Sequence, residues 1–86
     1  MKIIKVNAMW CPGCLISKNI WNEIEKEYPN HEYISLDYDL DEDIVEKYEV
    51  GEILPVVIIE ENNIEIKRII GEKSKKEIMD ELKNLL

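Results

Sequence analysis

The 86-residue sequence is poor in cysteine and histidine, the usual ligands of zinc. It contains only two cysteines, Cys11 and Cys14, and a single histidine, His31, which precedes a different predicted strand. A structural zinc ion needs four ligands, usually cysteines and histidines. We therefore expect no metal site within one chain and place His31 in a solvated loop. A cluster shared between two chains stays open at this point.

Basic residues are also scarce. The 11 lysines and arginines are outnumbered by 19 aspartates and glutamates, the net charge is -8, and the longest basic cluster is Lys75-Lys76. A chain this acidic repels the phosphate backbone of nucleic acids and the surface of anionic lipids. We therefore expect neither nucleic acid nor a membrane among its partners.

Long hydrophobic runs, repeats and linkers are absent. The longest apolar run, from Ile53 to Ile59, is far too short to span a bilayer and is interrupted by Pro55. Residues 1–6 lead directly into a strand pattern, without the apolar stretch and cleavage site of a secretory signal. We expect a cytoplasmic protein in which residues 1–86 form a single domain around one core.

What the sequence does contain is an alternation of strand and helix patterns. Hydrophobic residues make up 45% of the chain and charged residues 35%, which is typical of a folded protein. In the first helix Ile16, Ile20, Ile24 and Tyr28 recur at four-residue intervals, and Trp21 is expected to pack beside them. The expected elements are a strand over 2–7, a helix from Pro12 to Tyr28, a strand over 33–37, a short helix capped by Asp39 or Asp41, strands over 56–60 and 64–70, and a last helix opened by the capping box Ser74 and Glu77 and carrying Ile78, Met79, Leu82, Leu85 and Leu86.

The order of these elements is β-α-β-α-β-β-α. Strands joined through a helix should be parallel, whereas the two strands joined by Glu61-Asn62-Asn63 should form an antiparallel hairpin. The sequence therefore predicts an α/β protein with a mixed four-stranded sheet flanked by three helices.

The two cysteines stand three residues apart in the stretch Trp10 to Cys14, where the first strand gives way to the first helix. A disulfide that closes so small a ring would constrain the unfolded chain very little, which argues against a structural role. A redox dithiol, half of a metal site and a chance pair are the remaining interpretations. Because a helix N-terminus favours a thiolate, the redox interpretation makes Cys11 the attacking thiol and Cys14 the resolving thiol.

The sequence resembles the thioredoxin family in three places: the stretch Trp10 to Cys14, Leu54-Pro55 before the hairpin, and Gly71 before the last helix. The resemblance covers nearly the whole chain and implies a thioredoxin-like fold, with Pro55 in the cis form against the cysteines. It also implies a thiol–disulfide oxidoreductase that reduces protein disulfides. The expected site comprises the catalytic residues Cys11 and Cys14 and a substrate surface formed by Trp10, Pro12, Gly13, Leu54, Pro55 and Gly71.

The same resemblance implies the partners and the cellular role. The implied partners are disulfide-containing protein substrates and a thioredoxin-reductase-type flavoprotein. The implied role is in electron transport and cell redox homeostasis. The protein itself is expected to be a monomer that needs no bound cofactor. One position departs from the family, because thioredoxins carry a buried aspartate as proton acceptor for the resolving thiol where this chain has Lys5. An ammonium group near the motif would favour a thiolate but cannot serve as that base, so we expect resolution that is slow or uses water.

Two other functions remain possible on the sequence alone. The order Pro12-Gly13 is that of glutaredoxins, which act through glutathione, but glutaredoxins usually have Thr-Val before the cis proline and Gly-Gly-Asp near the last helix. This chain has Ile53-Leu54 and Gly71-Glu72 at those places, and Glu72 would repel the anionic tripeptide. The other alternative is a binding module, either a dimeric cluster carrier or a redox-inactive adaptor that uses the surface around Pro55.

Overall fold

A computed structural model describes residues 1–85 and shows one mixed four-stranded sheet with three helices. Along the chain the elements are β1 (Lys2–Asn7), α1 (Pro12–Glu27), β2 (Glu32–Asp37), α2 (Glu42–Lys47), β3 (Val56–Glu61), β4 (Ile64–Ile70) and α3 (Lys75–Leu82). The strand order is β2-β1-β3-β4, with β1 parallel to β2 and the other pairs antiparallel. The expected element order and mixed sheet are confirmed.

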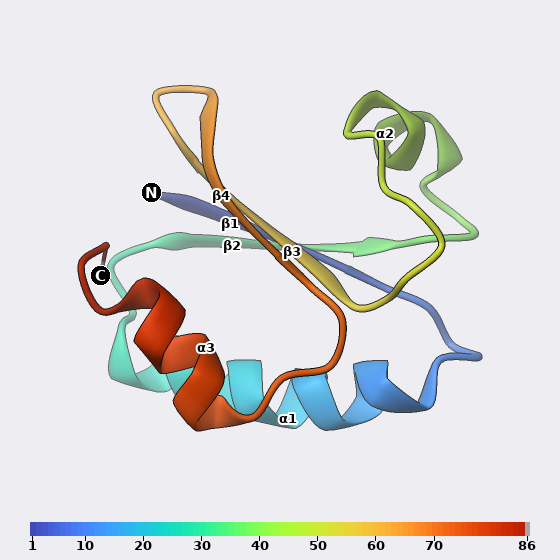
Figure 1. The fold of residues 1–86 in the computed structure, drawn as a ribbon. Coiled ribbons are helices and arrows are strands. Elements are labelled where there is room, and N and C mark those ends of the chain that lie inside the picture. Colours follow the sequence, from blue (N-terminus) through green and yellow to red (C-terminus); the bar gives the residue numbers. More distant parts are fainter. Residues whose placement is uncertain (86) are drawn as a thin grey trace.

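The helices lie on both faces of the sheet (Figure 1). Helices α1 and α3 cover one face, and the short helix α2 lies on the other. The central strands β1 and β3 are therefore buried on both sides, and their sequences KIIKVN and VVIIEE lack the polar alternation of a half-exposed strand. Since β1 and β2 are parallel and β3 is antiparallel to them, the loops after β1 and β2 and the loop before β3 lie at the same edge of the sheet.

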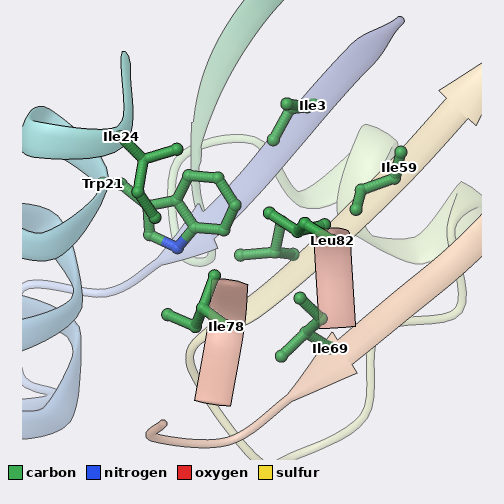
Figure 2. Close-up of a cluster of buried hydrophobic side chains, with 8 residues drawn as sticks. Ile3, Trp21, Ile24, Ile59, Ile69, Ile78 and Leu82 are labelled. Carbon is green, nitrogen blue, oxygen red and sulfur yellow. The ribbon is translucent and has the colours of Figure 1, made fainter. Parts of the chain in front are cut away.

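The larger hydrophobic core fills the space between the sheet and the two helices α1 and α3 (Figure 2). Trp21 of α1 is only 1% exposed and lies beside Ile78 and Leu82 of α3. The expectation that Trp21 is a packing residue is thus confirmed. The buried members of this core are Ile3, Trp21, Ile24, Val57, Ile59, Ile69, Ile78 and Leu82. This packing fixes helix α1, and with it the cysteines, against the sheet.

The predicted apolar face of helix α1 was wrong in its first turns. Ile16 is 52% exposed, and the buried residues of the helix are Cys14, Ser17, Trp21 and Ile24. Residues four apart advance by about 40° around a helix, so a series with only that spacing drifts away from one face. Alternating spacings of three and four keep Cys14 and Trp21 on the sheet side.

The helix ends confirm the expected caps only in part. The Ser74 hydroxyl accepts from the Glu77 amide, the Glu77 carboxylate accepts from the Ser74 amide, and the capping box is complete. Asp41 does precede α2, but its carboxylate accepts from the amide of Asp37 instead of capping the helix. Leu86, which the sequence places on the apolar face of the last helix, lies outside the described residues. Within residues 1–85 no helix has the length and apolarity needed to cross a membrane.

Candidate active site

The two cysteines occupy the junction between strand β1 and helix α1. Cys11 is the N-cap of the helix and Pro12 is in its first turn, where a missing amide hydrogen costs nothing. The amide of Cys11 donates to the carbonyl of Ala8 at 3.2 Å and so closes the turn that follows the strand. This turn brings both sulfur atoms to the edge of the sheet, as the sequence predicts.

The thiols are free and differ in their surroundings. The amide of Cys14 donates to the Sγ of Cys11 at 3.2 Å, a contact that stabilises negative charge on that sulfur. Cys14 is only 3% exposed, and burial together with its hydrogen bond to Cys11 raises the pKa of its thiol to about 11. The two thiols therefore lie in different environments, and the raised pKa of Cys14 keeps its thiol protonated near neutral pH.

The loop before strand β3 packs against these thiols. The Leu54–Pro55 peptide bond is cis, as expected, and Leu54 contacts the buried cluster of Ala8, Cys11 and Cys14. The carbonyl of Pro55 accepts from the amide of Gly71 at 2.8 Å. Gly71 has a φ of 89°, a conformation that favours glycine.

Trp10 lies on the surface beside the thiols and is 60% exposed. Its Nε1 donates to the Asp39 carboxylate at 2.8 Å, and its ring meets Tyr38 edge-on at 6.1 Å. Tyr38 in turn packs on the cysteine cluster. Neither partner is identified from the sequence alone, although Tyr38 and Asp39 directly follow β2 and the carboxyl ends of parallel strands share an edge. That neighbourhood is the signal that could have identified them.

Gly13 lies under the side chain of Glu72. A Cβ on Gly13 would be 3.4 Å from both Cβ and Oε2 of Glu72, which is ordinary van der Waals contact. The carboxylate therefore lies over the first turn of α1, between the loop after β4 and the exposed Pro12. The structure thus brings together all of the site residues that the sequence named, and it adds Tyr38, Asp39 and Glu72 to them.

The structure places the ammonium group of Lys5 beside a carboxylate of helix α1. Its buried Nζ donates to Glu25 of helix α1 at 2.6 Å and lies 5.8 Å from the centre of the Tyr33 ring. Lys5 and Cys14 line the same cavity, of about 410 Å³, between α1 and the edge formed by β1 and β2. The ammonium is paired with a carboxylate instead of a sulfur.

Other polar groups add little to the site. His31, expected in solvent, is half-buried, with Nδ1 buried and unpartnered among residues 1–85, and its ring meets Tyr33 edge-on. In the same part of the chain no three histidine, cysteine, aspartate or glutamate side chains are grouped to hold a metal ion.

Comparison with known proteins identifies the family. The family described as Thioredoxin matches residues 1–84. The chain belongs to the thioredoxin family. It is 30% identical to thioredoxin H5 of Oryza sativa subsp. japonica over 69 residues, which are 80% of this chain and 50% of that protein. It is 28% identical to a thioredoxin of Mycoplasma genitalium over 82 residues, which are 95% of this chain and 79% of that one.

Solved structures show the same fold. Oxidised mitochondrial thioredoxin 3 from Saccharomyces cerevisiae superposes with a TM-score of 0.87 at 24% identity, over 98% of this chain and 77% of that one. Thioredoxin from Fasciola hepatica gives 0.88 at 22% identity, over 96% and 78%. The chain thus has the thioredoxin-like fold, although it spans only half the length of the rice protein. Membership of the thioredoxin family supports a thiol–disulfide oxidoreductase in general.

Proposed function

We propose that this thioredoxin-family protein reduces protein disulfides by cycling between the Cys11–Cys14 dithiol and its disulfide. The observation that supports this most strongly is the asymmetry of the two thiols. Cys11 caps helix α1 and accepts a hydrogen bond from the Cys14 amide, whereas Cys14 is buried and its thiol has a raised pKa. Attack and resolution require that difference, because a thiolate attacks a disulfide and a thiol does not.

The reaction begins when the Cys11 thiolate attacks one sulfur of the substrate disulfide. A bond forms between that sulfur and Cys11, the substrate S–S bond breaks, and the departing substrate sulfur takes up a proton. Cys14 then loses its proton and attacks the Sγ of Cys11. The bond between Cys11 and the substrate breaks, and the second substrate sulfur leaves as a thiolate that takes up a proton from solvent. The substrate gains two electrons and two protons, and the protein is left with a disulfide.

The surface around the thiols supports a role in holding an extended substrate. Trp10 is exposed at one side, while Pro12, Gly13 and Gly71 lie at the other, where Glu72 covers the first helical turn. The loop containing Leu54 and Pro55 lies between them and presents backbone next to the cysteines. In our proposal these residues bind the substrate chain and take no part in the proton or electron transfer.

Thioredoxins carry an aspartate that accepts the proton of the resolving thiol, but this chain has Lys5 at that position, and Lys5 is paired with Glu25. The cavity behind Cys14 is polar in part and roomy enough for water, which needs only some tens of Å³. We infer that water in this cavity takes the proton. Resolution should accordingly be slower than attack near neutral pH and should accelerate as the pH rises.

The oxidised protein needs a two-electron donor to complete the cycle. We infer a thioredoxin-reductase-type flavoprotein as this donor, because the Glu72 carboxylate lies over the first turn of α1 and would repel the anionic glutathione there. We further propose that the protein acts as a monomer in the cytoplasm. Supplying the oxidised protein with NADPH and either regenerating system tests this. Rapid turnover of a glutathione mixed disulfide, with none from any reductase, would assign the protein to the glutaredoxin side.

The function itself is tested with two cysteine variants in an insulin reduction assay. Cys11→Ser should be inactive, and Cys14→Ser should accumulate a mixed disulfide on Cys11 that mass spectrometry detects. Activity retained in Cys11→Ser would show that the assigned roles are wrong. Freshly purified protein should also be colourless, since visible absorbance would indicate the cluster carrier instead.

A further inference from the structure

The side chain of Glu72 lies at the mouth of the site, yet the reaction proposed above needs no carboxylate there. Its Cβ and Oε2 are each 3.4 Å, and its Cδ 3.5 Å, from the place of a Cβ on Gly13, the residue between Pro12 and Cys14. Glu72 is exposed, and within residues 1–85 it forms no ion pair. Its negative charge is therefore available to a molecule that approaches the cysteines.

A second carboxylate reaches the site from the other side. Asp39 follows strand β2 and holds the indole of Trp10 at 2.8 Å, while Glu72 follows strand β4. Strands β2 and β4 are the two opposite edges of the sheet, so the two acids approach the thiols from opposite directions. Exposed apolar side chains also lie at this rim, including Trp10 and Ile53, whose Cγ2 lies 3.7 Å from the Cβ position of Gly71.

We propose that Glu72 is a specificity-determining residue that selects disulfides flanked by lysine or arginine. The proposal rests on the disulfide-reductase function above and names its substrate class: an extended segment with a basic side chain next to the reacting cysteine. Neighbouring residues of an extended chain are about 3.3 Å apart along its axis, so a side chain next to the attacked sulfur reaches the first turn of α1. Opposite charge at that point favours the encounter, and the net charge of -8 acts in the same direction.

The test uses two synthetic peptides, each with one intramolecular disulfide, that differ only in carrying lysine or glutamate beside the cysteines. The wild-type protein should reduce the lysine peptide with the higher kcat/KM, and the preference should shrink in high salt. Glu72→Gln should lower the ratio of the two kcat/KM values about threefold, and Glu72→Lys about tenfold, because exposed charge pairs contribute modestly. The matched control is Glu61→Gln, which removes the same charge from an exposed site at the β3–β4 hairpin, far from the cysteines (Figure 1).

The proposal is overturned if Glu72→Gln leaves the ratio of the two kcat/KM values unchanged, even where both values fall. It is also overturned if Glu61→Gln shifts that ratio as much as Glu72→Gln does. Failure of the wild-type protein to reduce either peptide would instead refute the proposed function. The charge preference is then measured by nuclear magnetic resonance titration with peptides whose cysteines are replaced by serine. Preferential binding of the lysine peptide that Glu72→Gln abolishes supports the proposal, and equal binding of both peptides refutes it.

Discussion

Replacing Glu25 with glutamine should destabilise the protein, because it removes the counter-charge of a buried lysine. The side chain of Lys5 is 11% exposed and that of Glu25 is 30% exposed, with Nζ and Oε2 separated by 2.6 Å. Removing one partner of a fully buried pair costs about 3–5 kcal/mol, whereas exposed pairs contribute about 0.2–1 kcal/mol. The partial exposure of Glu25 puts this pair between those limits, at about 2 kcal/mol. In a domain of this size that loss lowers the Tm by roughly 10 °C.

The assay is urea unfolding of the reduced protein for Lys5→Met, Glu25→Gln and the double variant. The double variant should recover most of the stability lost by Glu25→Gln alone, because an apolar side chain of similar length replaces the buried ammonium. The matched control is the pair Lys67–Glu81, which has the same 2.6 Å separation but side chains 35% and 44% exposed. Equal coupling energies for the two pairs would refute the conclusion that burial makes the Lys5–Glu25 pair important.

Three further predictions concern other parts of the molecule. Burial raises the pKa of Cys14 to about 11, so the stability gained by keeping its thiol neutral is present below about pH 9 and lost as the pH rises through 11. This pH-dependent stability, about 2–3 kcal/mol, should be missing when the unfolding of Cys14→Ser is measured against pH. Trp21→Ala should cost about 3–5 kcal/mol in urea unfolding, but Trp21→Phe much less, because the buried Nε1 has no hydrogen-bond partner within residues 1–85; equal losses would contradict this. Lys5→Asp should speed release of a trapped substrate only when Glu25→Ala removes the facing carboxylate, and unchanged release kinetics would show that this position does not act on Cys14.

The sequence predicts the fold well because its elements are marked by local signals. The β-branched runs of β3 and β4 meet at Asn62 and Asn63, which adopt positive φ in the hairpin, and the Ser74–Glu77 box marks the start of α3. The face of a helix depends on how it docks, so the spacing of isoleucines placed Ile16 in the core although it is exposed. Local sequence signals therefore predict where a helix or strand begins and ends better than they predict which of its sides is buried.

The site could be predicted in its cysteines and in cis Pro55, but its supporting contacts could not. Trp10 bonds to a residue 29 positions away, and Lys5 to one 20 positions away. Such contacts depend on tertiary packing, because no local sequence pattern around one partner indicates which residue the other will be. A lone lysine in an apolar strand indicates only that some carboxylate must approach it, because a buried charge requires a partner.

The spacing of the two cysteines follows from the geometry of a helix start. Cys11 is the cap and Cys14 lies in the first turn, so the amide that a cap residue normally bonds belongs to the second cysteine, Cys14. The same backbone bond that orients the Cys11 sulfur therefore holds the Cys14 thiol one turn deeper, where burial raises its pKa. Trp21 locks this helix against α3, so the positions of both sulfur atoms are set by the hydrophobic core. Inserting one residue after Gly13 would rotate Cys14 away by about 100° and remove the bond and the burial together, so the difference between the two thiols depends on this spacing.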